Sequence, residues 1–147
     1  MTRGAVAGRL LAAAATLALA ACAGVEQAPP KLSDAELSAI VADVLEAVEA
    51  VDGVAEAEAW YRYSGPTDGL TLRVTVVGEQ GSEDCQALAE EAGRAVVETV
   101  ARLSENPSMS LGAALPAEGD EPAVECAASW SPATLNKAAK HYDVSRG

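Results

Sequence analysis

Apolar residues recur at intervals of three and four positions in two segments of the chain, which is the spacing of amphipathic helices. The first segment follows a capping box, Ser33-Asp34-Ala35-Glu36, and Gly53 is a good stop signal. Its apolar stripe consists of Leu37, Ile40, Val41, Val44, Val48 and Val51. The second predicted helix takes Ser82 as its N-cap. Its stripe consists of Leu88, Ala92, Ala95, Val96, Val100 and Leu103.

Four other segments alternate between apolar and polar residues and predict strands. Between residues 54 and 64, alanines and tyrosines fall on one face, and Glu56, Glu58, Trp60 and Arg62 fall on the other. A loop with glycine and proline at 65–69 joins this run to a second one at 70–77, so the two predict a β-hairpin. Residues 108–115 and 123–131 predict two more strands, joined by the acidic loop 116–122. Pro132 then predicts the start of a short final helix within 134–142.

The predicted order of elements is therefore α-β-β-α-β-β-α. Helices that alternate with hairpins favour an α+β fold. We expect a two-layer sandwich in which a four-stranded antiparallel sheet carries the helices on one face, a permuted relative of the ferredoxin-like plan. This domain is predicted to cover residues 33–147. The chain contains no phenylalanine, so its core must be built mainly from small and aliphatic side chains.

The first 21 residues have the layout of a secretory signal peptide. Arg3 and Arg9 supply positive charge, and the uncharged apolar run from Leu10 to Leu19 is too short to span a membrane. The sequence Leu19-Ala20-Ala21-Cys22 resembles the lipobox of bacterial lipoproteins. An ordinary cleavable signal peptide with an incidental cysteine is the alternative.

The resemblance implies that the leader is cut before Cys22 and that Cys22 carries a diacylglyceryl group and further acylation such as palmitate. It also implies a protein anchored in the cell membrane on the extracytoplasmic side. Two or more acyl chains give stable attachment, whereas one chain would not. Residues 22–32 would then be the lipidated cysteine and a flexible tether, of which nine residues span at most about 30 Å.

The chain has a formal charge of −12, which becomes −14 when Arg3 and Arg9 leave with the leader. This acidic balance argues against nucleic acid as a partner, because phosphate binding needs a surplus of lysine and arginine. It also means that anionic lipid headgroups repel the domain, so the lipid anchor has to hold it.

Two cysteines remain besides Cys22. Cys85 shares the apolar stripe of its helix, and Cys126 is in phase with Val124, Ala128 and Trp130 on the inward face of its strand. In an exported protein such a pair predicts a disulfide between Cys85 and Cys126. Two buried, unpaired thiols are the alternative.

Catalytic and metal-binding patterns are scarce. His141 is the single histidine and lies in the polar C-terminal segment without an activated-serine motif, so we interpret it as a solvated residue at a helix end. The acidic pair Glu90-Glu91 is predicted to be solvated surface. The loop at 116–122 lacks the ligand spacing of an EF-hand. We therefore expect no enzyme, no cofactor and no metal site.

Trp60 is the one feature that suggests a contact surface. If the tyrosine face of its strand packs on the helices, Trp60 lies on the open face of the sheet with Arg62 and Arg73, and such residues often anchor protein interfaces. The leading hypothesis is a non-catalytic, membrane-anchored interaction or assembly module. A lipoprotein that binds a small molecule or lipid is the alternative, and a carboxylate-dependent enzyme is the third. The ligand-binding alternative requires a cavity lined by Val44, Val48, Val74, Val76 and Leu111.

Overall fold

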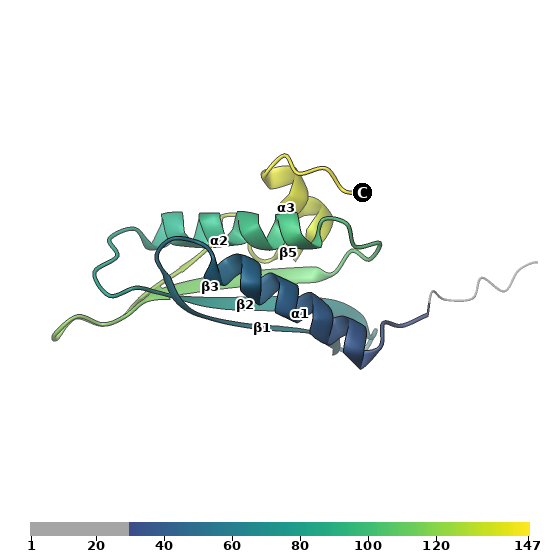
Figure 1. Ribbon diagram of the computed structural model, residues 1–147, viewed down its shortest axis with the longest axis horizontal. Helices are drawn as coiled ribbons and strands as arrows, with labels where there is room; N and C mark the ends of the chain where they lie inside the picture. The colour runs from purple at the N-terminus through teal and green to yellow at the C-terminus, as the bar shows by residue number, and fades with distance from the viewer. Residues whose placement is uncertain (1–29) are drawn as a thin grey trace, which may run out of the picture. The chain divides into compact units, whose positions relative to one another are not determined.

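The computed structural model describes residues 30–147, so the predicted signal peptide, Cys22 and most of the tether lie outside the described residues. Leu32–Gly147 forms one compact unit. Its elements, in chain order, are α1 (Asp34–Glu49), β1 (Val54–Ser64), β2 (Gly69–Gly78), α2 (Cys85–Val100), β3 (Ser108–Leu115), β4 (Val124–Ala127), β5 (Ala133–Thr134) and α3 (Leu135–His141). Figure 1 shows their arrangement.

The predicted capping box starts α1. The Ser33 hydroxyl accepts a hydrogen bond of 3.2 Å from the backbone N–H of Glu36, and the Glu36 carboxylate accepts one of 2.7 Å from the backbone N–H of Ser33. Both hydrogen bonds satisfy backbone groups that the first turn of a helix leaves open. They also lower the pKa of Glu36. The helix ends at Glu49, four residues before Gly53, whose φ of +87° suits glycine.

The sheet is mixed, and the prediction of an antiparallel sheet was wrong. The strand order is β1-β2-β3-β4, and the short β5 also pairs with β3. β1 and β2 form the predicted antiparallel hairpin, and β3 pairs antiparallel with β4 and β5, but β2 and β3 are parallel. The reason is α2, which carries the chain back along the sheet so that β3 starts at the same end as β2. The fold is α+β with the predicted order of elements, but a parallel central pair departs from the ferredoxin-like plan.

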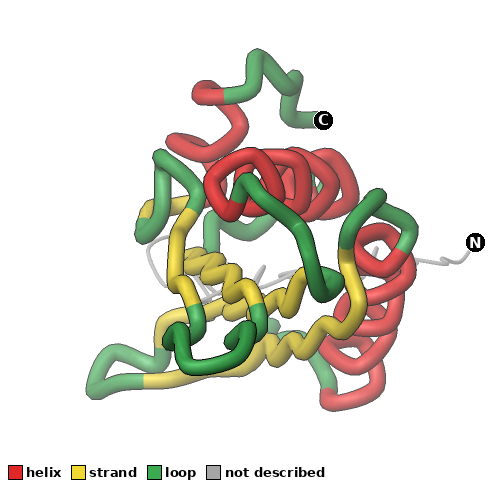
Figure 2. The backbone as a smooth tube through the Cα atoms, turned by 90° about the vertical axis from the view of Figure 1, so that its left-hand side faces the viewer, coloured by secondary structure: helices red, strands yellow, loops and turns green. Residues whose placement is uncertain are grey.

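Among the elements of residues 30–147, helices pack against one face of the sheet and none covers the other. Figure 2 shows α2 over the strands and α1 beside the end of the sheet formed by β1, and Figure 1 shows α3 on the side of α2 that faces away from the sheet. The core lies between the helices and the inward face of the strands. Its fully buried members include Val44, Val48, Leu72, Val74, Val76, Val96, Val97, Met109 and Leu111.

Three predicted boundaries were wrong. The N-cap of α2 is Asp84, whose carboxylate accepts a hydrogen bond of 2.9 Å from the N–H of Ala87, whereas Ser82 belongs to the preceding turn. β4 ends at Ala127 instead of residue 131, because the chain turns there and the Ser131 hydroxyl accepts a hydrogen bond from the N–H of Leu111. The final helix starts at Leu135 with Thr134 as N-cap, so Pro132 precedes β5 instead of opening the helix.

Candidate protein-interaction surface

Trp60 and Tyr61 are adjacent in β1 and lie on opposite faces of the sheet. Tyr61 is 4% exposed and belongs to the core, whereas Trp60 is half-buried on the open face. Arg62 and Arg73, both exposed, share this face. The alternation in the sequence therefore placed these side chains correctly. Their role as contact residues stays a prediction.

Trp60 has an arginine on two sides. The Arg62 guanidinium carbon lies 4.2 Å from the centre of the indole ring, which is the geometry of a cation–π contact. Arg73 is the direct cross-strand neighbour of Trp60 in β2, and such neighbours have Cβ atoms roughly 4.5–5.5 Å apart. We call Trp60, Arg62 and Arg73 the Trp60 patch. It combines a flat apolar ring with two positive charges in an acidic chain.

The open face becomes hollow and more acidic away from the Trp60 patch. A hollow of about 310 Å³ lies over β2, β3 and β4, where Arg73 and Glu125 border small residues such as Ser110, Gly112 and Ala114. A smaller hollow of about 160 Å³ is bordered by Glu56, Glu58 and Val77. The face therefore carries positive charge on one side and carboxylates on the other.

A groove of about 380 Å³ lies between the N-terminal half of α1 and the middle of β1. Leu37, Val41, Ala59 and Tyr61 contribute its apolar lining. Its polar lining comes from Asp34, Ser38 and Arg62, and Trp60 also borders it. Residues from both faces of β1 line the groove: Ala59 and Tyr61 belong to the face that packs on the helices, and Trp60 and Arg62 belong to the opposite face.

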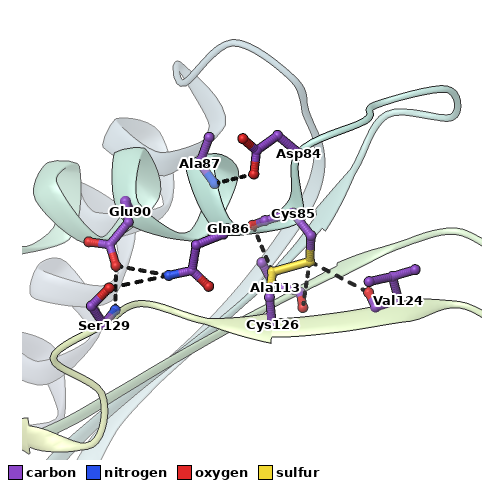
Figure 3. The surroundings of a disulfide bond; sticks show 9 residues. All are labelled: Asp84, Cys85, Gln86, Ala87, Glu90, Ala113, Val124, Cys126 and Ser129. Carbon is purple, nitrogen blue, oxygen red and sulfur yellow. Dashed lines mark hydrogen bonds between the residues drawn. A yellow bond between two sulfur atoms is a disulfide. The ribbon is translucent and has the colours of Figure 1, made fainter.

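The structure confirms the disulfide between Cys85 and Cys126 (Figure 3). Their Cα atoms are 5.9 Å apart, and the bond joins the first residue of α2 to β4. Cys126 is half-buried, and Val124, which was expected on the same inward face, is 53% exposed. The disulfide therefore lies near the border of the helix–sheet interface.

The sequence pattern predicted that Glu90 is solvated surface, and for Glu90 this prediction was wrong. Its side chain is 26% exposed, and its carboxylate accepts hydrogen bonds from the N–H of Ser129, from the side-chain amide of Gln86 at 3.0 Å and from the Tyr142 hydroxyl at 2.9 Å. Figure 3 shows the side of this cluster formed by Gln86 and Ser129. His141 lies 3.4 Å from the same carboxylate.

These contacts keep Glu90 ionised. Desolvation alone would raise its pKa, but the hydrogen bonds from Ser129, Tyr142 and His141 outweigh it and lower the pKa to about 2. A carboxyl group with so low a pKa is a poor proton donor at neutral pH. The Glu90 cluster therefore holds the C-terminal segment against α2. The sequence analysis missed this cluster because its members lie up to 52 residues apart in the chain. The one feature of the sequence that pointed to it was the presence of Trp130, His141 and Tyr142 close together near the C-terminus.

The five residues proposed to line a ligand cavity, Val44, Val48, Val74, Val76 and Leu111, are at most 1% exposed and pack in the core cluster. Among residues 30–147, no group of three or more His, Cys, Asp or Glu side chains could hold a metal ion. In the same part of the chain, no helix is long and apolar enough to cross a membrane.

Comparisons with protein-family models, with curated proteins and with solved structures found no match to this chain.

Proposed function

We propose that the protein is a lipid-anchored, non-catalytic interaction or assembly module of the bacterial cell envelope. The observation that carries this proposal is the Trp60 patch on a sheet face that neither α1, α2 nor α3 covers. The lipobox-like sequence that ends at Cys22 supports attachment to the membrane on its extracytoplasmic side. The disulfide supports a domain that works in an oxidising compartment.

The chemistry of the patch favours a protein partner that presents carboxylates. Arginine forms directed, bidentate hydrogen bonds with carboxylates, and a tryptophan beside it adds apolar contact area. Tryptophan and arginine are also enriched among the residues that contribute most to binding. A partner surface with a glutamate or aspartate beside an apolar residue fits Trp60, Arg62 and Arg73.

The anchor is tested by changing Cys22. In wild-type cells we expect labelling by radioactive palmitate and recovery of the protein in the membrane fraction. Cys22→Ala should abolish the label and move the protein out of that fraction. A Cys22→Ala variant that stays with the membrane in wild-type amounts would show that the lipid is not what holds the protein.

Docking is tested by photo-crosslinking in intact cells. A photoreactive amino acid at Thr75, an exposed residue two positions from Arg73 on the same face of β2, is compared with the same probe at Glu91, an exposed position on α2. We expect one dominant protein adduct from position 75 that is missing from position 91, and mass spectrometry identifies it. Equal background labelling from both positions, in cells where the protein is lipidated and folded, would refute docking at the patch.

A further inference from the structure

The larger hollow of the open face, which we call the β3 hollow, lies over β2, β3 and β4 beside the Trp60 patch. Its volume of about 310 Å³ is within the range of protein ligand sites, which is roughly 300–1,000 Å³. Arg73 belongs to the Trp60 patch and also borders the β3 hollow. The patch and the hollow therefore form one continuous surface.

Two opposite charges border the β3 hollow on opposite sides. Arg73 of β2 pairs with Ser110 of β3, and Glu125 of β4 pairs with Ala114 of β3. Four residues along β3 and two strand spacings therefore separate the two charged residues, which corresponds to roughly 16 Å between their Cα atoms. Both residues are exposed, and neither has an ion-pair partner among residues 30–147. Both charges are thus available to a bound molecule.

Gly112 lines the same hollow from the middle of β3. A glycine inside a strand often marks a bulge or a site where a ligand or another backbone comes close. The pairing of Gly112 with Thr75 in β2 and with Ala127 in β4 shows no register shift, so there is no bulge. Its φ is not positive, and a Cβ atom there would lie 4.0 Å from its nearest neighbour, the carbonyl oxygen of Cys126. The fold therefore accepts a side chain at this position, and close approach of a bound molecule explains the glycine.

We infer that the β3 hollow binds an extended segment of the partner protein that carries an acidic and a basic side chain about five residues apart. The acidic side chain binds Arg73, the basic side chain binds Glu125, and the backbone between them passes over Gly112. An extended chain advances by about 3.3 Å per residue, so a segment of this length covers the separation of the two charges. This inference rests on the proposed function, because it specifies which part of the partner binds beside the Trp60 patch.

Filling the hollow tests the inference without disturbing the fold. Gly112→Val places a side chain that favours strands where the structure has room, so the urea midpoint of unfolding should equal or exceed that of wild type. Docking of the full lipidated protein is measured in intact cells with a photoreactive amino acid at Glu58, an exposed residue of the open face outside the hollow. Gly112→Val should reduce the protein adduct at least tenfold. Ser108→Val, an exposed position on the same strand and face outside the hollow, should leave it at the wild-type level.

Charge reversal tests the basic end of the bound segment. Glu125→Lys places a positive charge beside the basic side chain of the partner, so the adduct from the same probe should also fall at least tenfold. Glu121→Lys makes the same change of charge in the exposed loop before β4, outside the β3 hollow, and should not change the adduct.

The inference requires that Gly112→Val and Glu125→Lys both lose the adduct while both controls keep it. A wild-type amount of adduct in either variant would overturn the inference, and docking at the Trp60 patch would still stand if Trp60→Ala loses the adduct. Crosslinking to residues 23–29 of the same chain would mean that the tether covers this face, which also overturns the inference. No adduct above background in wild type, from this probe or from the probe at Thr75, would contradict the inference and the proposed function together.

Discussion

The hydroxyl of Tyr142, the residue after α3, donates a hydrogen bond of 2.9 Å to the carboxylate of Glu90 in the middle of α2. The same hydroxyl accepts a hydrogen bond of 2.8 Å from the indole N–H of Trp130. Burial, together with the nearby Glu90 carboxylate, raises the pKa of Tyr142, so the hydroxyl stays protonated and able to donate. These contacts hold α3 and Tyr142 against α2, on the side of α2 that faces away from the sheet.

The low pKa of Glu90 predicts a specific contribution to acid stability. Because folding lowers the pKa from 4.5 to about 2, the ionised carboxylate stabilises the fold above pH 4.5, and this stabilisation is lost as the pH falls towards 2. Glu90→Gln replaces charge-assisted hydrogen bonds by neutral ones and should cost about 1 kcal/mol at pH 7. Urea unfolding between pH 2 and pH 7 measures this difference.

The difference between wild type and Glu90→Gln should shrink as the pH approaches 2, where wild-type Glu90 also loses its charge. Glu91→Gln, at the exposed neighbouring position, should follow the wild-type curve at every pH. If Glu90→Gln is less stable than wild type by the same amount from pH 7 to pH 2, the charge on Glu90 is not the cause of the difference.

Gly93 allows the C-terminal aromatic residues to approach α2. A Cβ atom at this position would lie 2.5 Å from the Tyr142 hydroxyl oxygen and 3.0 Å from the indole nitrogen of Trp130. Their mutual hydrogen bond prevents either side chain from moving away at no cost. In an open helix, Gly→Ala would stabilise by about 1 kcal/mol. At Gly93 the added methyl group overpacks the contact, so Gly93→Ala should instead lower the free energy of unfolding by about 1–2 kcal/mol. Thermal or urea unfolding measures this loss. An increase in stability would show that the contact is not tight.

The sequence predicted local structure well and long-range pairing poorly. Alternation along residues 54–64 separated Trp60 from Tyr61, because successive side chains of a strand point to opposite faces. The parallel pairing of β2 and β3 was missed, since periodicity identifies a strand but not its neighbour. Glu90 was misjudged for a related reason: its surroundings come from Ser129 and Tyr142, which only the folded chain brings to α2.

The disulfide should contribute a large share of the stability of this domain. It closes a loop between positions that are 41 residues apart, and the entropy lost by the unfolded chain corresponds to about 4 kcal/mol. Natural domains are often stable by only about 5–15 kcal/mol. The double variant Cys85→Ala with Cys126→Ala should therefore unfold at much lower urea concentration than the oxidised wild type. A reducing agent should shift the wild-type midpoint towards that of the variant and leave the variant unchanged.

Alanine substitutions of Trp60 and Tyr61 compare a proposed contact residue with a core residue of the same strand. Tyr61 is 4% exposed, and removing a buried aromatic side chain costs about 3–5 kcal/mol. Trp60 lies on the open face, so Trp60→Ala should cost about 1 kcal/mol or less while it abolishes the crosslinked adduct. Urea unfolding of both variants, with crosslinking from a probe placed at Thr75 on the same face of β2, separates the two effects. A loss of stability in Trp60→Ala as large as in Tyr61→Ala would mean that the fold itself requires the tryptophan.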